Sequence, residues 1–335
     1  MGTTKRLLTS VIRFLLAPLA AYAERYLLCW ANPMMSTDFR SIVAPILNDA
    51  FDGRYEKRKD EWKMTHEQRQ GIPRSYHEEP VLFGLGAAPE IPDGEPVPYD
   101  TGGELYQARY NYKVVGTAYA MTRILVEDGD HIRIGTMFAG EAADAMAETK
   151  ETKCANNLNR SFNALFPGGD GVSLVNTAHP LGPGAGFGSN QLAVAAALSQ
   201  TSAEQLLIQV RNAFDDRGKR IRLTPLKFVV SPSNMFQAET IVKSVLRPDT
   251  ANNAINAIKS MGLLQEETAV ISRLTSTTAW WIKTDAPRGL TLMMRRALSK
   301  EMQGDFETDS TRWRCSERYE PFWTVWRTVF GTAGV

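Results

Sequence analysis

The chain has 335 residues and a mass of 37.2 kDa, enough for one large domain or two modest ones. Hydrophobic residues make up 43% and charged residues 22%, which excludes wholesale disorder. The 38 Lys and Arg residues nearly balance 37 Asp and Glu residues, and a net charge of +1 argues against a function in non-specific nucleic-acid binding alone. The three cysteines are widely separated and the four histidines share no metal-ligand spacing, so we expect no disulfide framework, metal site or cofactor.

The N-terminal segment is apolar. Its run 7–23 follows two basic residues and ends in small residues, a pattern that is typical of a secretory signal peptide. Arg13 and Pro18 interrupt the run, and the remaining apolar piece of about ten residues is too short to cross roughly 30 Å of hydrocarbon. We therefore expect an amphipathic helix or an extension upstream of a start at Met34 or Met35, with the signal peptide as the alternative.

Residues 37–121 fall into three stretches of different composition. Residues 37–51 place apolar side chains at helical spacing, which predicts a helix, and the charged run Arg54–Lys63 is expected to be a solvated surface. Residues 78–104 then contain seven carboxylates, no Lys or Arg, five prolines and five glycines, a net charge of −7. Because a structureless loop of that length is improbable inside a compact domain, we expect an arm that projects onto another molecule. Residues 106–121 are predicted to return as one strand.

A long helix is predicted over residues 136–162, where it would span about 40 Å at 1.5 Å per residue. The helix breakers of Pro167–Gly171 follow it. We expect a helix of this length to act as a spine in a mixed domain. The stripe predicted to be buried is narrow and rich in small residues: Phe138, Ala142, Ala145, Thr152, Ala155, Leu158 and Phe162.

The second half of the chain alternates helices and strands, and no internal repeat is present. Together with the first half, this pattern predicts the α+β class. The expected helices are 203–214, capped by Ser202, and one from Pro232 toward Leu246; the expected strands are 226–230, 278–283, 290–295 and 322–330.

Few residues offer catalytic chemistry. Ser173, His179 and Asp170 are the residue types of a hydrolase triad, but no G-x-S-x-G motif is present. The glycine-rich segment 182–188 does not match a phosphate-binding G-x-G-x-x-G motif and is expected to be a surface loop. The pair Asp215-Asp216 is expected to be solvated, ahead of a compact basic turn. We therefore expect no enzyme.

The order of these parts resembles the major capsid proteins of tailed phages, whose fold is shared with encapsulin shells. At residue level the chain is most similar to the Mu-like prophage major head subunit group, over about residues 36–335. The motifs that carry this resemblance are the strand Tyr112–Ile124 entering Glu127-Asp128, Thr149-Lys-Glu151, Ala155-Asn-Asn-Leu-Asn159, Asp170-Gly171, Thr177-Ala-His-Pro180, Asn190, Thr250-Ala-Asn-Asn253, Asn256, Leu274-Thr275 and Ala279-Trp-Trp281.

The resemblance implies a tailed-phage major-capsid fold, in which a spine helix lies in a peripheral domain. Residues 1–34 have no counterpart and form an N-terminal extension of open role. The implied divisions are an N-terminal arm over 35–77, an extended β loop over 78–118, a peripheral domain over 119–170 and 306–335, and an axial domain over 171–305.

The resemblance also implies a structural function. The chain would self-assemble into pentamers and hexamers of an icosahedral phage head, which encloses double-stranded DNA by non-specific contact on its inner face. Assembly would take place in the host cytoplasm, without a membrane, and scaffolding, portal and decoration proteins are further partners that the resemblance suggests. The alternatives are an encapsulin-like bacterial nanocompartment and, more distantly, a secreted hydrolase using Ser173, His179 and Asp170.

Charge complementarity predicts where neighbouring subunits touch. The acidic arm should lie across an adjacent subunit with its carboxylates facing basic groups there. The expected carboxylates are Glu90, Asp93 and Glu95. The expected basic partners are Lys150 and Lys153 of the spine, the charged run Arg54–Lys63, or the turn residues Arg217, Lys219, Arg220 and Arg222.

Overall fold

The computed structural model describes residues 36–247, 254–264, 266–305, 307 and 310–335. The expectations for the N-terminal extension and for the motif Thr250-Ala-Asn-Asn253 lie outside these residues. The chain divides into two compact units, each built from three stretches of sequence. The first contains residues up to Gly53, Ala118–Glu141 and Glu301–Arg314; the second contains Arg54–Thr117, Ala142–Lys300 and Cys315–Val335.

The first unit is organised around an aromatic contact. The predicted N-terminal helix is confirmed as α2 (Ser36–Tyr55), which buries the side chain of Phe51. The ring of Phe51 lies 5.6 Å from that of Trp313, and Tyr119 lies 5.3 Å from the same indole. The Trp313 Nε1–H donates to Asn48 Oδ1 at 3.1 Å, so the one polar atom of this buried ring is satisfied.

The second unit contains the largest hydrophobic core. Its four-stranded sheet has the order β12-β9-β7-β8, with β9 antiparallel to both of its neighbours and β8 parallel to β7. Trp280, Trp281 and Phe228 are fully buried in this core. The elements are α5 (Gln200–Arg211), β7 (Pro225–Val230), α6 (Met235–Lys243), α7 (Ala257–Ser260), β8 (Ala269–Val270), β9 (Trp280–Thr284) and β12 (Val329–Thr332).

A second four-stranded sheet has the order β1-β10-β11-β4. Two two-stranded sheets complete the strands, β2 with β3 and β5 with β6. The remaining elements are β1 (Glu67–Gln70), β2 (Tyr76–Phe83), β3 (Gly103–Asn111), β4 (Lys113–Thr122), α3 (Arg123–Glu127), α4 (His131–Asn159), β5 (His179–Pro180), β6 (Phe187–Gly188), β10 (Thr291–Asp305), β11 (Ser310–Phe322) and the short 3₁₀ turns Glu61–Met64, Pro232–Asn234 and Trp326–Thr328.

The spine helix is present as α4, five residues longer at its start than predicted and three shorter at its end. Its buried stripe differs from the expected one, because Phe138, Ala145 and Thr152 are exposed. Lys150 and Glu151 lie on the buried side instead. Charged residues within the buried face hid the helical period from a pattern based on hydrophobicity alone.

Several boundaries differ from the sequence predictions, including that of the strand predicted over 290–295, which continues to Asp305 as β10. The single strand over 106–121 is wrong, since the chain changes sheets at the buried Tyr112, between β3 and β4. The strand over 322–330 is also wrong: β11 ends at Phe322 and a 3₁₀ turn separates it from β12. The N-cap of α5 is Ser199 rather than Ser202, because the two serines form a reciprocal capping box in which Ser202 occupies the third helical position.

None of the described helices is both long and apolar enough to cross a membrane.

Candidate functional site

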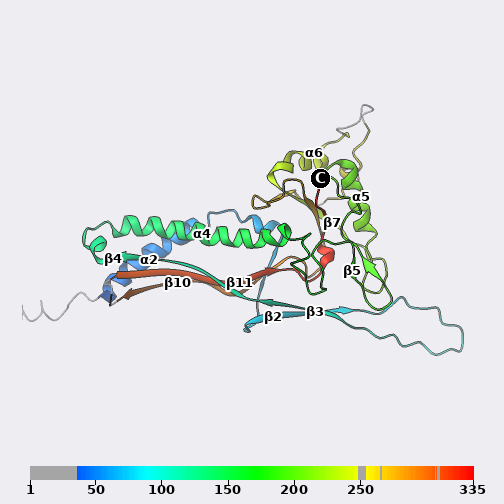
Figure 1. Cartoon of the computed structure of the whole chain (residues 1–335), viewed down its shortest axis with the longest axis horizontal. Helices are drawn as coiled ribbons and strands as arrows, with labels where there is room; N and C mark the ends of the chain where they lie inside the picture. Colours follow the sequence, from blue (N-terminus) through cyan, green and yellow to red (C-terminus); the bar gives the residue numbers. More distant parts are fainter. Residues whose placement is uncertain (1–35, 248–253, 265, 306, 308–309) are drawn as a thin grey trace, which may run out of the picture. The chain divides into compact units, whose positions relative to one another are not determined.

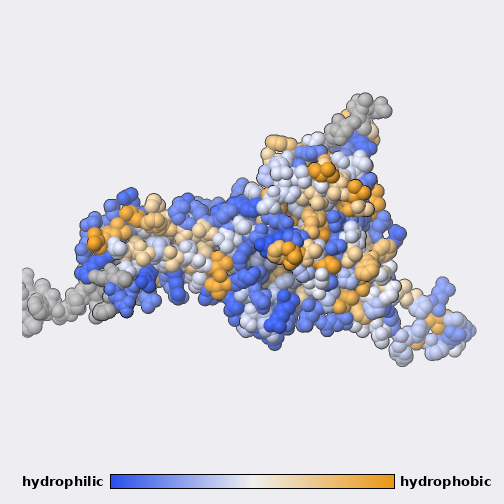
Figure 2. Space-filling view, in the orientation of Figure 1, coloured by the Kyte–Doolittle hydropathy of each residue, from blue (hydrophilic) through white to orange (hydrophobic). Residues whose placement is uncertain are grey.

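The most distinctive feature of the second unit is the hairpin of β2 and β3, which continues into a long loop over residues 84–102 (Figure 1). The two strands pair antiparallel from Tyr76 with Asn111 to Phe83 with Gly103. Nearly every side chain of the loop is exposed, including those of Val97 and Tyr99, and Figure 2 shows hydrophobic residues among hydrophilic ones on its surface. A loop with so little contact to its own chain is suited to bury its surface against another molecule.

The strands that carry the loop are firmly attached to the second unit. Tyr110 stacks on Phe322 with ring centroids 4.1 Å apart, and its hydroxyl donates to the carbonyl oxygen of Trp323. The Tyr106 hydroxyl donates to the carbonyl oxygen of Thr324 at 3.0 Å. Burial raises the pKa of both phenols well above the usual value, so both remain donors at neutral pH. The hairpin therefore presents the loop from a fixed base.

The three loop carboxylates predicted to contact a neighbour are solvent-exposed. Glu90, Asp93 and Glu95 lie at the far end of the loop, where Glu95 N–H donates to Pro92 O at 3.2 Å in a turn. Within the described part of the chain, none of the three carboxylates has an ion partner. Their position leaves them available to basic groups outside their own chain.

The basic turn that was predicted to receive such an arm contacts the loop of its own chain. Arg217 Nη2 donates to Asp100 Oδ1 at 2.6 Å, and Lys219 Nζ donates to Leu85 O, also at 2.6 Å. Arg220 donates to the neutral Asn212, so a carboxylate does not neutralise its charge there. Arg222, also predicted at a subunit contact, is exposed on the segment that follows.

The two predicted contact lysines of the spine helix lie against β11. Lys150 Nζ is 2.8 Å from Glu317 Oε2 and 2.6 Å from the Tyr55 hydroxyl, with the side chains of Lys150 and Glu317 only 9% and 1% exposed. Burial raises the pKa of the Glu317 carboxyl. Burial lowers the pKa of Lys150, but the adjacent Glu317 and Tyr55 outweigh it, so the net direction is upward. Lys153 lies one turn further on, 3.8 Å from a carboxylate oxygen of Glu320.

A second ion cluster, which sequence reasoning missed, joins the charged run to α4. Glu148 Oε2 lies 2.6 Å from Arg58 Nη2 and 2.6 Å from Arg273 Nη2, while Arg54 pairs with Asp144 at 2.6 Å. These hydrogen bonds, the one from Arg273 first, lower the pKa of the Glu148 carboxyl to about 2. The prediction that the run Arg54–Lys63 is a solvated surface is therefore wrong for Arg58, whose side chain is 24% exposed, whereas Arg54 stays half exposed beside its partner. The helical spacing of Asp144 and Glu148 was the available signal.

The residues of the hydrolase alternative do not form a triad. His179 Nδ1 is 2.6 Å from Asp170 Oδ2, but Nε2 faces Asn190 Oδ1 at 3.1 Å. Ser173 Oγ donates to Val175 O instead of approaching the imidazole. His179 also stacks on Trp326 at 4.4 Å with an interplanar angle of 7°, and its side chain is fully buried. His179 and Asp170 are thus a buried structural pair, and they activate no nucleophile.

Hydrogen bonds of the Asn190 side chain fix the orientation of the His179 imidazole. Its Nδ2 donates to the carbonyl oxygens of Leu174 at 2.7 Å and Val329 at 2.8 Å, so its Oδ1 must serve as the acceptor. Oδ1 accepts from Asn176 N–H at 2.8 Å, and its contact with His179 then requires a proton on Nε2. The network is complete without a ligand.

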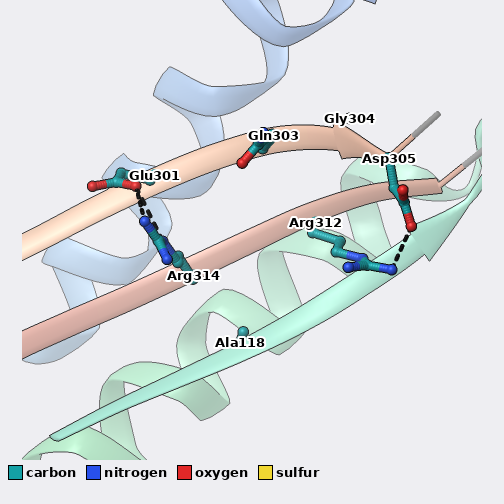
Figure 3. Close-up of a pocket in the computed structure, with 7 residues that line it drawn as sticks. All are labelled: Ala118, Glu301, Gln303, Gly304, Asp305, Arg312 and Arg314. Atoms are coloured by element: carbon teal, nitrogen blue, oxygen red, sulfur yellow. Dashed lines mark hydrogen bonds and ion pairs between the residues drawn. The ribbon is translucent and has the colours of Figure 1, made fainter.

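One pocket of the first unit lies on its strands, and Figure 3 shows ion pairs across it. Arg314 pairs with Glu301, and Arg312 pairs with Asp305. Both arginines are neutralised by neighbours in the pocket wall, which leaves the pocket without a free charge to hold a ligand. No group of three or more possible metal ligands occurs among the residues that the structure describes. The lining residues are Ala118, Glu301, Gln303, Gly304, Asp305, Arg312 and Arg314.

Solved structures with similar folds include one of Mycobacterium phage Adephagia, with 11% sequence identity and a TM-score of 0.51 over 83% of this chain and 91% of that chain. A structure of Microbacterium phage Oxtober96 has 11% identity and a TM-score of 0.50 over 82% of this chain and 90% of that chain. A virus-like particle from Pyrococcus furiosus has 10% identity and a TM-score of 0.49 over 86% and 98% of the two chains. At such identities the two phage structures establish the fold alone, and they confirm the predicted α+β capsid fold.

The sequence itself identifies the family. No match was found among curated proteins. A family model described as phage capsid protein matches residues 94–330, well over half of the chain. The matched residues include α4, the strands of both four-stranded sheets except β1 and the end of β12, and residues 94–102 of the loop. The chain is therefore a structural protein of a capsid shell, and it belongs to the phage capsid protein family.

Proposed function

We propose that this capsid protein self-assembles into the pentamers and hexamers of an icosahedral phage head, and that the head encloses double-stranded DNA. The observation that carries the proposal is the exposed loop 84–102 on its rigid hairpin. A lone subunit leaves the loop's apolar side chains in water, whereas a closed symmetric assembly can bury them on a neighbour. The chain's net charge of +1 also permits many copies to pack closely without strong repulsion.

The loop supplies both apolar and electrostatic contacts to a neighbour. Leu85, Val97 and Tyr99 are exposed and would bury apolar surface on docking. Glu90, Asp93 and Glu95 would face basic groups of the adjacent subunit. One exposed ion pair contributes only about 0–1 kcal/mol, but a closed shell repeats each contact in every subunit, so that the small contributions act together. The loop's prolines limit its freedom before docking and so lower the entropy lost on ordering.

The assembly state is the first test. We expect size-exclusion chromatography and electron microscopy of the purified full chain to reveal closed shells. Native particles should also contain nuclease-protected double-stranded DNA. Shells that enclose an enzyme and no DNA would favour the encapsulin-like alternative, and a chain that stays monomeric under all assembly conditions would refute the proposal.

The second test reverses the charge of the loop. Replacing Glu90, Asp93 and Glu95 together with lysine should leave the subunit folded but impair shell formation, most strongly at low salt, where screening is weakest. The variant Glu90→Gln, Asp93→Asn, Glu95→Gln should have a weaker effect, since it removes the attraction without adding repulsion. Glu267→Lys is the control for a single charge reversal on an exposed carboxylate outside the loop. Normal assembly of the triple lysine variant at low ionic strength would show that apolar and backbone contacts hold the loop.

A further inference from the structure

The two ends of the extended loop are joined by one carboxylate. Asp100, near the end of the loop, accepts a hydrogen bond from Gly86 N–H at 2.6 Å, near its beginning. The same carboxylate accepts from Thr101 N–H at 2.8 Å and from Arg217 Nη2 at 2.6 Å. These hydrogen bonds, the one from Gly86 first, lower the pKa of Asp100, so the acceptor is ionised at neutral pH. Lys219 Nζ adds a bond to the carbonyl oxygen of Leu85.

The turn that supplies Arg217 and Lys219 is itself rigid. Asp215 N–H donates to Lys219 O at 2.7 Å, and Gly218 N–H donates to Asp215 O at 3.0 Å. Gly218 has a φ of +76°, a conformation that residues with a side chain rarely adopt. The backbone of the turn is thus closed on itself, with its two cationic side chains directed at the loop.

The turn is also anchored in the hydrophobic core of the second unit. The buried Arg327 donates from Nη2 to Asp216 Oδ1 at 2.7 Å and from Nε to Phe214 O at 2.7 Å. The expectation that Asp216 is solvated is therefore wrong, because its carboxylate neutralises a buried guanidinium. A continuous series of hydrogen bonds runs from the core through the turn to both ends of the loop.

Close packing at the end of the hairpin completes the arrangement. The Arg217 guanidinium lies 5.6 Å from the centroid of the Phe83 ring, a cation–π distance. A Cβ on Gly103 would lie 2.8 Å from the same ring, which is closer than real Cβ contacts allow. The ring therefore lies between the base of the loop and the turn, where it restricts rotation of the hairpin end.

We propose that Asp100, Arg217 and Lys219 form an intramolecular clasp that sets the direction of the extended loop before a neighbouring subunit is met. The benefit of this clasp to assembly rests on the proposed function. A loop already held at both ends loses less conformational entropy on docking than a free one. Arg217 and Lys219 are then positioning residues for the loop of their own chain, rather than docking residues for the loop of a neighbour.

The test measures the clasp in the unassembled subunit. The full chain is kept at a concentration where chromatography shows no shells, and amide hydrogen exchange is followed in peptides that cover residues 84–102. Arg217→Ala should accelerate exchange at Gly86 and its neighbours about fivefold, the upper range for an exposed pair. Arg217→Lys should restore part of the protection, because it keeps the charge but not the planar fork. Arg211→Ala, an exposed arginine in the last turn of α5, should leave the loop unchanged.

The outcomes separate the clasp from the proposed assembly. Protection of Gly86 that is absent in subunits and arises only in shells would overturn the clasp, because the contact would then be intermolecular. An unchanged exchange rate in Arg217→Ala would overturn it as well. If the wild-type chain forms no shells but Arg217→Ala still accelerates exchange, the clasp stands and the proposed assembly fails. If both stand, Arg217→Ala should raise the subunit concentration needed for assembly several-fold without changing the melting temperature.

Discussion

The ion pair of Lys150 and Glu317 is buried in the second unit and should be costly to break. Lys150→Met removes the cation but leaves a carboxylate whose side chain is 1% exposed and whose Oε1 has no hydrogen-bond partner in the described structure. Removal of one partner of a buried pair typically costs about 3–5 kcal/mol, because the other charge stays desolvated. Roughly 2–4 °C of melting temperature is lost per kcal/mol in domains of 150–250 residues, so we expect a decrease of at least about 6 °C.

The double variant Lys150→Met, Glu317→Leu separates desolvation from packing. It replaces both charges with apolar groups of similar size, and we expect it to melt above the single variant despite carrying one more substitution. Lys153→Met is the matched control one turn along α4, where the side chain is 24% exposed and its carboxylate partner lies at 3.8 Å. Differential scanning calorimetry of the full chain measures all three. Equal melting temperatures for Lys150→Met and Lys153→Met, or a double variant that melts no higher than Lys150→Met, would refute the reasoning.

Three further predictions concern acid stability, covalent chemistry and the N-terminus. The pKa of Glu148, about 2 in the folded chain, lies below its ordinary 4.5, so its ion pairs with Arg58 and Arg273 stabilise the fold above pH 4.5 and lose that effect as the pH falls through 2. In chemical denaturation at a series of pH values, Glu148→Gln should reduce the loss of unfolding free energy between pH 4.5 and pH 2 by no more than about 1 kcal/mol, since half the side chain is exposed. Residues 78–112 contain no lysine that could form an isopeptide cross-link with a neighbouring subunit. Mature particles boiled in detergent should therefore run as a single band near 37 kDa or below, and a ladder of covalent oligomers would contradict this. A chain that starts at Met35 should still assemble; a folded variant that never forms shells in electron micrographs would show the extension to be essential.

The fold was predictable where hydrophobic period and chain breakers agreed. The helix of α2 and the buried strand β7 carry regular apolar spacing; β7 was placed within one residue, and α2 begins one residue before the predicted start and ends four residues after the predicted end. The single strand over 106–121 failed because β3 and β4 share one uninterrupted run of strand-forming residues, and only tertiary pairing divides it at Tyr112. Likewise, Phe322–Phe330 alternates like a strand, but the i to i+3 bond from Thr328 N–H to Val325 O turns the chain.

The candidate site was harder to predict, because an ion pair is a contact between segments far apart in sequence. The acidic loop was found from composition alone, since seven carboxylates with prolines and glycines cannot form a core. Lys150 was expected at a subunit contact, since most lysines are exposed, and its partner Glu317 gave no local signal. Asp216 was missed for the same reason, since its guanidinium partner Arg327 lies 111 residues away.

The distribution of paired and unpaired charge narrows how the loop can dock. Of the six basic residues of the spine and the turn that were predicted at subunit contacts, Lys150, Lys153 and Arg217 are each paired with a carboxylate of their own chain. Lys219 and Arg220 instead donate to a carbonyl and an amide, so their charge is not neutralised by a neighbouring carboxylate. With the clasp residue Lys219 set aside, the predicted contact cations without a carboxylate partner in the described structure are Arg220 and Arg222, at and just after the basic turn, while the loop carboxylates without an ion partner lie at its far end. If this asymmetry drives docking, the attraction acts over a Debye length of about 8–10 Å, and assembly should weaken steadily as salt rises. The clasp, whose atoms are already in contact, should be much less sensitive to the same salt, so the two contributions can be distinguished within one titration.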